Sequence, residues 1–324
     1  MKRKFRVTFI TSIILAATSV NAQTIKDPIQ WNENTTIDTP ISVLIDTVNS
    51  ARRIALLANS GATVNLMGPS IEVTVSASKY NESTTFAGIR ATDGATLNLG
   101  GDETKNINVS VNVSGNDPTK DGPLAIGINA LRSDPQSAPE LFVSAENLVV
   151  NVHSEDGYAY GIQVQNGTQE STAKKATLVI NAKNTLINAT SGREGGYANG
   201  IVAFSAGQLA INGNLEVNSE NVISARGDAV IRINESGENK VVLNGNMDFN
   251  YDDPSSGTKV DADVLVNLTG AESQWNGNAF VSWNGNITNE ELTKVSGLRL
   301  VLADKAQWNP TIITSSSIYK YVIN

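Results

Sequence analysis

The segment YAYGIQVQNG, residues Tyr158–Gly167, is one of several copies of the same short pattern in this chain. A large residue, Ala, any residue, Gly and Ile recur in LAIGINALRS (Leu124–Ser133) and YANGIVAFSAG (Tyr197–Gly207), and more loosely in TFAGIRATDG (Thr85–Gly94). The shared glycines are separated by 39, 34 and 39 residues and are Gly88, Gly127, Gly161 and Gly200. A period of this length is typical of solenoids, propellers and other arrays.

Each unit contains three short strand-like segments and one longer polar loop. In the unit that begins at Gly88 the segments are GIRA, TLNL (Thr96–Leu99) and NINVSVNV (Asn106–Val113). The last of them alternates apolar and polar residues strictly, which indicates a strand with one buried side. A propeller blade would need four antiparallel strands and regular hairpin turns. We therefore predict an all-β chain folded as a right-handed parallel β-helix, or β-solenoid, with about three strands per rung.

Stacking of the units fixes which side chains meet, because parallel strands of successive rungs pair about 4.8 Å apart. The pattern predicts an interior ladder of Ile89, Ile128, Ile162 and Ile201, and outward positions at Arg90, Asn129, Gln163 and Val202. The repeated glycine marks a corner. It supplies either a backbone angle that other residues resist or room for nearby aromatic side chains.

The two ends of the chain differ from the repeats. Residues 1–22 combine a basic start, an apolar run and Ala22 at the expected cleavage position, so we predict a secretory signal peptide. We expect an N-terminal cap and first strands at 23–53, solenoid repeats at 54–310 and a tail at 311–324. Ile41–Asn59 is the one ambiguous segment, compatible with a short helix or a capping element.

Composition excludes some classes of function. Loss of the four basic residues of the signal peptide takes the net charge from −8 to −12, which does not suit a nucleic-acid binder. No other segment is apolar for long enough to cross a bilayer as a helix. The 324 residues include no cysteine, so stability must come from repetition or from a large core. The 37 asparagines suit turns and outward ladders.

The C-terminal part adds a more specific likeness. The segments AESQWNGNAFVSWNGN (Ala271–Asn286) and GLRLVLADKAQWNP (Gly297–Pro310) resemble "Ala-x-Trp" strand motifs, carried here by Trp275, Trp283 and Trp308. Together with the signal peptide and the solenoid, they resemble the passenger region of a bacterial autotransporter of the pertactin-like β-helix type. The resemblance implies surface, secreted or periplasmic localisation in a Gram-negative bacterium. Because the sequence ends at ITSSSIYKYVIN, we expect a separate or missing translocator barrel.

Residues for catalysis do not gather in the sequence. The outward strand positions stack no pair of carboxylates, which glycoside hydrolysis needs, and the single histidine, His153, has no metal-ligand companions. Two Asp-rich loops, with Asp117 and Asp121 and with Asp252, Asp253, Asp261 and Asp263, match no ordered calcium loop and are better explained as solvated turns. We therefore expect no catalytic, cofactor-binding or metal site.

One short motif is a weak candidate for binding. Arg226, Gly227 and Asp228 form an integrin-type tripeptide, which is also explained as the turn before AVIRI. The sequence as a whole favours an exported, non-enzymatic, adhesin-like scaffold, whose partner is a surface protein or glycan of a host or neighbouring cell. The alternative is a secreted β-helix enzyme, a polysaccharide lyase or hydrolase.

Overall fold

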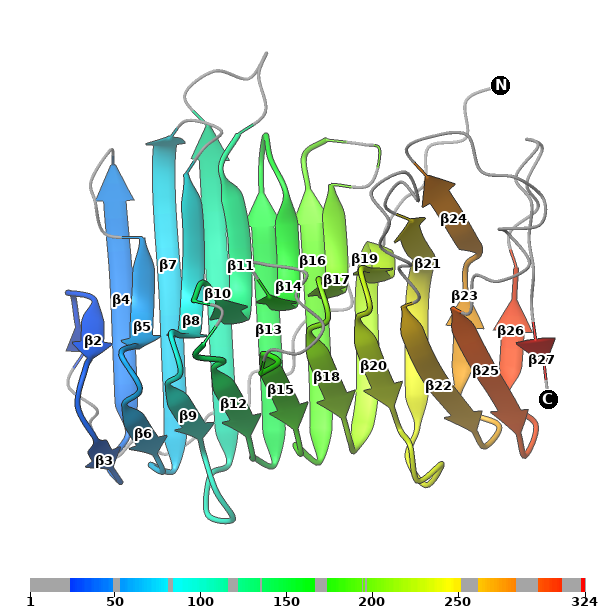
Figure 1. The fold of residues 1–324 in the computed structure, drawn as a ribbon, viewed down its shortest axis with the longest axis horizontal. Helices are drawn as coiled ribbons and strands as arrows, with labels where there is room; N and C mark the ends of the chain where they lie inside the picture. The colour runs from blue at the N-terminus through cyan, green and yellow to red at the C-terminus, as the bar shows by residue number, and fades with distance from the viewer. Residues whose placement is uncertain are drawn as a thin grey trace.

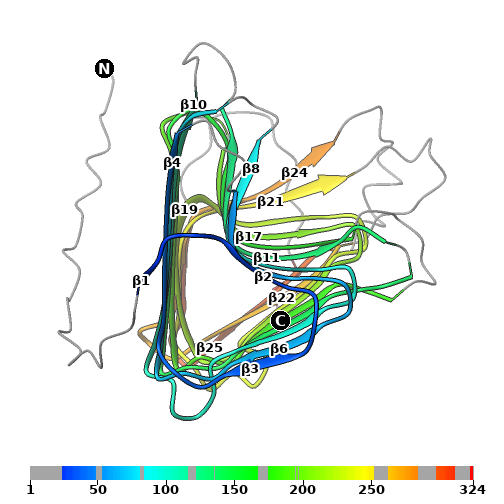
Figure 2. The same cartoon turned by 90° about the vertical axis from the view of Figure 1, so that its left-hand side faces the viewer.

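The chain winds into a parallel β-helix, as the repeat predicts (Figure 1). The computed structural model describes residues 24–48, 53–80, 84–115, 122–134, 136–166, 174–193, 195, 197–251, 262–283, 297–310 and 322–323. All the regular secondary structure in these residues is β-strand, and the strands of successive rungs pair in parallel. Viewed from the N-terminal end, the chain turns clockwise as it recedes, so the β-helix is right-handed (Figure 2).

Three faces enclose the core, and each takes one strand from most rungs. The long-strand face contains β1 (Thr24–Ile25), β4 (Ile41–Val48), β7 (Ser70–Tyr80), β10 (Asn106–Gly115), β13 (Asn147–Ser154), β16 (Asn184–Ser191), the first parts of β19 (Asn214–Arg226) and β21 (Val241–Tyr251), β23 (Gln274–Asn276) and β26 (Gln307–Asn309). The glycine face contains β2 (Ile29–Trp31), β5 (Ile54–Ala58), β8 (Thr85–Thr92), β11 (Leu124–Arg132), β14 (Ala159–Asn166), β17 (Ala198–Phe204), the second parts of β19 and β21, and β24 (Ala279–Trp283).

The short-strand face forms a separate 10-stranded sheet. It contains β3 (Thr35–Ile37), β6 (Thr63–Leu66), β9 (Thr96–Leu99), β12 (Glu140–Val143), β15 (Thr177–Ile180), β18 (Gln208–Ile211), β20 (Val230–Ile233), β22 (Asp263–Thr269), β25 (Leu298–Ala303) and β27 (Val322–Ile323). The segment from Ile41 that left a helix or a cap open thus forms strands β4 and β5. Even β1, β2 and β3 pair with the strands of the next rung.

The predicted interior ladder is confirmed. Ile89, Ile128 and Ile162 are direct register partners, Ile162 pairs with Ile201, and all four are fully buried. Neighbouring rungs extend the ladder with Leu56, Ile223 and Met247. On the long-strand face, β10 alternates as predicted, with its Ile and Val residues in the core. Each inward position therefore supports the same position one rung away, which is why the pattern must repeat.

The repeated glycine serves close packing and not an unusual backbone angle, since none of the four has a positive φ. Each lies where a glycine-face strand crosses a long strand of the same unit. A Cβ on Gly88 would lie 2.5 Å from Val109 Cγ1, and one on Gly161 would lie 2.3 Å from Ile187 Cγ2. Of the two explanations that the sequence left open, room is therefore correct. The room is needed by Val and Ile of the long strands, not by aromatic side chains.

This crossing bends the cross-section of the β-helix at the glycine face. In Figure 2 the upper parts of the long strands extend past the triangular core, with the first residues of the glycine-face strands against them. Tyr80 and Phe86 hold this extension by an edge-to-face contact with ring centroids 4.6 Å apart. The glycine-face strands then bend to form one side of the triangle, so the outer side of the glycine face is concave.

Candidate functional site

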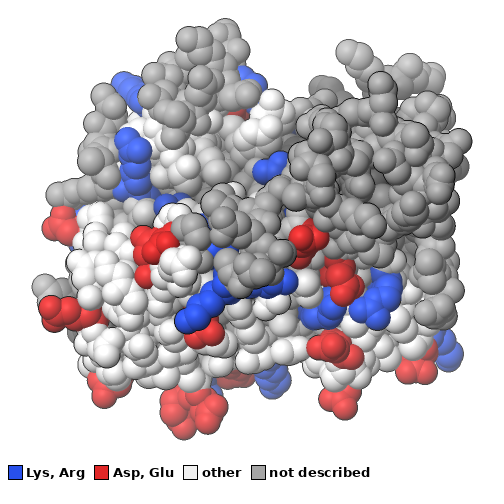
Figure 3. Space-filling view, in the orientation of Figure 1, with Lys and Arg blue, Asp and Glu red and all other residues white. Residues whose placement is uncertain are grey.

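The charged side chains are unevenly placed on the surface. Figure 3 shows acidic groups along the lower rim of the molecule, where the short strands turn into the long strands. Asp102, Glu103, Glu235 and Glu238 are exposed in these turns. The described residues contain no group of three or more His, Cys, Asp or Glu side chains that could hold a metal ion. Three surfaces are candidate binding sites: a groove along this corner, the outer side of the long-strand face, and an aromatic strip on the glycine face.

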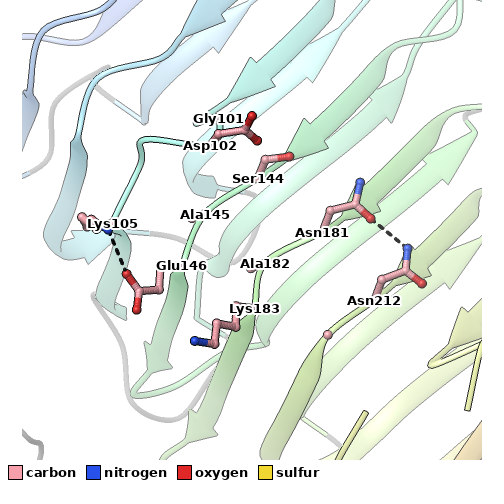
Figure 4. A pocket seen from close by; sticks show the side chains of 11 residues that line it. Gly101, Asp102, Lys105, Ser144, Ala145, Glu146, Asn181, Ala182, Lys183 and Asn212 are labelled. Atoms are coloured by element: carbon pink, nitrogen blue, oxygen red, sulfur yellow. Dashed lines mark hydrogen bonds and ion pairs between the residues drawn. The ribbon is translucent and has the colours of Figure 1, made fainter. Parts of the chain in front are cut away.

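The first surface is a shallow groove along the same corner, about 570 Å³ in volume (Figure 4). Small residues from four successive turns form its floor, among them Gly101, Ala145 and Ala182. Lys105 and Glu146 form an ion pair of 3.4 Å at one side, and both side chains are largely exposed. The groove thus offers two carboxylates, Asp102 and Glu146, of which Glu146 is paired with Lys105. Because a glycosidase needs two carboxylates, the alternative of a carbohydrate-active enzyme rests on this groove.

The second surface is the outer side of the long-strand face, which carries a continuous asparagine ladder. Each side-chain Nδ2 donates to Oδ1 of the asparagine one rung earlier, at 2.7–3.0 Å. The members are Asn151, Asn188, Asn218, Asn244, Asn276 and Asn309. This confirms the expected outward ladders. Its amides are satisfied mainly by one another, so the face is flat, polar and already hydrogen-bonded.

The same face carries His153, which lies on the surface as predicted. Its ring nitrogens lie 2.9 Å from Thr190 Oγ1 and 3.0 Å from Glu155 Oε2. Of the two Asp-rich loops, Asp117, Asp121 and residues 252–261 lie outside the described residues. Asp263 bonds Arg232 at 2.5 Å across neighbouring strands of the short-strand face.

The third surface is an aromatic strip on the concave side of the glycine face, made of Tyr158, Tyr160, Tyr197, Phe204 and Arg226. Tyr158 and Tyr197 stack with ring centroids 4.5 Å apart, and Tyr158 lies 6.0 Å from Tyr160. Tyr160 meets Phe204 edge to face at 6.4 Å, and the Arg226 guanidinium carbon lies 3.9 Å from the centre of the Phe204 ring. Five side chains from three successive rungs thus form one connected band.

The strip is accessible at its Tyr158 end. The side chain of Tyr158 is 39% exposed, one of four exposed large hydrophobic residues in the described chain, whereas Phe204 is 7% exposed. Burial, with a smaller contribution from Tyr158, raises the pKa of Tyr160 to about 12. The Tyr160 hydroxyl therefore keeps its proton at neutral pH and can donate a hydrogen bond.

A line of amides borders the strip. Asn129 Nδ2 donates to Gln163 Oε1 at 2.5 Å, and Gln163 Nε2 donates to Gln165 Oε1 at 3.0 Å. Gln163 and Asn129 are only 4% and 1% exposed. Gln165, by contrast, is partly exposed and accepts a bond at its oxygen, which leaves its amide N–H groups for an incoming ligand.

The prediction for these outward positions is corrected in one respect. Arg90, Asn129, Gln163 and Val202 occupy one register line, and none of these side chains belongs to the main hydrophobic core. Yet Val202 is fully buried, and burial lowers the pKa of Arg90 to about 10. Strand alternation gave the side correctly, but the bend in the strands makes this side concave and takes it out of solvent.

The integrin-type tripeptide lies next to this strip. Arg226 ends β19 and packs on Phe204, while Gly227 and Asp228 form a turn with φ of +68° and +49°. The backbone N–H of Ser205 donates to Arg226 O at 3.1 Å, and the N–H of Ala206 donates to Gly227 O. The tripeptide is thus the turn before β20, held in the stack of rungs, with only Asp228 fully exposed.

The aromatic strip is not predicted by the repeat pattern, although the sequence contains a signal for it. Two of the repeat copies begin with Tyr, at Tyr158 and Tyr197, where the others have Thr85 and Leu124. Because these positions precede the paired residues Ala159 and Ala198, adjacent rungs bring the two rings together.

Comparison with known proteins adds no relative to this description: no family model, curated protein or solved structure matches the chain. Among the described residues no helix is long and apolar enough to span a membrane.

Proposed function

We propose that this chain is an exported, non-enzymatic β-solenoid scaffold of adhesin type that binds a partner through its outer faces. The observation that carries the proposal is the asparagine ladder and the polar face around it. The ladder amides bond mainly to one another and so hold the face rigid, and amides and hydroxyls supply neither a strong nucleophile nor a proton at neutral pH. A rigid repeated surface of this kind suits binding over a large area.

The signal-peptide pattern of residues 1–22 and the likeness to autotransporter passengers support an extracellular place of action. The overall charge of −8, or −12 after the predicted cleavage, speaks against nucleic acid as the partner. The partner we expect is a protein or glycan of a host or neighbouring cell.

Two assays on purified secreted protein test the proposal. Fluorescently labelled protein should bind to whole cells or to extracellular-matrix preparations in a saturable way, and it should release no reducing sugars or unsaturated products from pectin, glucan or chitin. Turnover that disappears in Glu146→Gln, a variant in the corner groove, would overturn the scaffold and favour a carbohydrate-active enzyme. Absence of any saturable binding would also overturn it.

A further inference from the structure

We propose that the aromatic strip is a binding site for an acidic glycan, that is, for sugar rings that carry a carboxylate or a sulfate. This inference rests on the proposed function, because it names the ligand of one face of the scaffold. It places an oligosaccharide along the strip, with a sugar ring over Tyr158 at one end and an acidic group at Arg226 at the other.

Tyrosine rings suit the first half of this role. A sugar ring has an apolar C–H face, and ligand sites combine such apolar and aromatic contacts with a few placed polar groups. Tyr158 is exposed, and its ring is fixed by the stacked Tyr197 on one side and by Tyr160 nearby. A ring held in this way loses little conformational freedom when a ligand arrives, which favours affinity.

Arg226 supplies the second half. Its guanidinium is stacked on Phe204 at 3.9 Å, and in the described chain it has neither a hydrogen bond nor an ion pair. Stacking fixes the plane of the guanidinium but leaves the N–H groups at its edge free. Such an arginine is ready to bind a carboxylate or sulfate with two parallel hydrogen bonds.

The polar groups around the strip decide between an acidic and a neutral ligand. Arg226 and the amide N–H groups of Gln165 are donors, and the protonated hydroxyl of Tyr160 can donate. The nearby carboxylates are Asp228, exposed in the turn after Arg226, and Asp248, the register partner of Ser224. Arg90, in the same concave face, is a further cation, and its buried Nε has no hydrogen-bond partner in the described chain. The donors gathered at Arg226, Gln165 and Tyr160, on a protein with a net charge of −8, match a ligand group rich in acceptors and negative charge.

The proposal can be tested with a printed array and with calorimetry on the purified secreted protein. The probes are hyaluronan, heparin and sialyllactose oligosaccharides beside the neutral chitohexaose and lactose. We expect binding to at least one acidic probe, weaker binding at high salt because an ion pair is screened, and at least tenfold weaker binding to the matched neutral probe.

Variants locate the site. Tyr158→Ala and Arg226→Gln should each reduce the affinity at least about tenfold, and Arg226→Lys should recover only part of it, since lysine keeps the charge without the planar fork. Phe142→Ala is the matched control, because Phe142 is a partly exposed aromatic on the outer side of the short-strand face. Thermal unfolding of each variant checks that the fold is intact.

The outcomes separate the two proposals. If the wild type binds an acidic glycan and Tyr158→Ala weakens it no more than Phe142→Ala does, the strip is not the site, although the scaffold proposal stands. Preference for neutral probes, or for a single-stranded oligonucleotide, would overturn the acidic-glycan assignment. Saturable binding to cells without binding to any glycan would overturn it too, and would point to a protein partner for the scaffold.

Discussion

Replacement of Gly161 by alanine tests whether the repeated glycine exists to make room. The new Cβ would lie 2.3 Å from Ile187 Cγ2 and 2.6 Å from the backbone oxygen of Gly200, where carbon atoms ordinarily approach to about 3.5–4.0 Å. Overpacking of this kind costs about 1–3 kcal/mol, while Gly→Ala at a negative φ returns about 0.4–1 kcal/mol by restricting the unfolded chain. We expect a net loss of about 1–2 kcal/mol in the free energy of unfolding.

Urea unfolding followed by tryptophan fluorescence measures this loss. Gly101→Ala is the control, because Gly101 also lacks a positive φ and its Cβ would meet only Met67 Sδ at 3.5 Å, an ordinary contact. The control should change the stability by less than about 0.5 kcal/mol. Equal stability of Gly161→Ala and Gly101→Ala would refute the crowding argument, and the glycine would need another explanation.

Gly200 allows a finer test of the same cause. A Cβ there would lie 2.3 Å from Val217 Cγ1, a side-chain methyl group that can be removed. In a double-mutant cycle with Val217→Ala, the penalty of Gly200→Ala should shrink by at least about 1 kcal/mol, because the two changes share one space. Additive effects would contradict a direct clash.

Three further predictions concern the ladders and the export signal. Ile162→Asp should cost several kcal/mol, because it leaves an unpaired charge in the interior ladder, and a wild-type urea midpoint would contradict this. Acidification should remove a small stabilising contribution of Asp263: burial alone would raise its pKa, but the hydrogen bond and charge of Arg232, with help from Arg299, keep it below the ordinary value. The contribution is therefore present above the unfolded-state pKa of Asp263 and is lost as the pH falls through its folded-state pKa. Since the carboxylate is 43% exposed, the contribution should amount to at most about 1 kcal/mol. Urea unfolding at several pH values should show a greater acid sensitivity for the wild type than for Asp263→Asn. Mass spectrometry of secreted protein should give an N-terminus at or near Gln23, whereas an intact Met1 would contradict the predicted signal peptide.

The fold was accessible from the sequence because a parallel β-helix repeats its constraints. Ile89, Ile128 and Ile162 occupy equivalent positions, so their register could be assigned from the glycine that precedes each of them. The alternation in β10 likewise assigned inward and outward sides correctly. In both cases the prediction depended only on neighbours one rung away, which the period itself supplies.

The surface was less accessible because exposure depends on curvature. Alternation places Gln163 outside the core, but only the bend after Gly161 shows that this outside is concave and that Gln163 is 4% exposed. The same bend brings Tyr160 of one rung to Phe204 of the next. Period and spacing do not contain this angle, because it follows from the glycine-face strands packing against the long strands.

The aromatic strip contains two kinds of contact, and they bear differently on function. A stacked pair such as Tyr158 and Tyr197 also stabilises the stacking of rungs, by about 0.5–1.5 kcal/mol, so tyrosine at these positions does not by itself require a ligand. Arg226 differs in another way: its contact over Phe204 contributes a similar amount, about 0.5–2 kcal/mol, but it leaves the guanidinium N–H groups without a partner in the described chain. The case for a glycan site is therefore strongest at Arg226. If Arg226→Gln leaves the stability unchanged while it abolishes glycan binding, the arginine serves the ligand and not the fold.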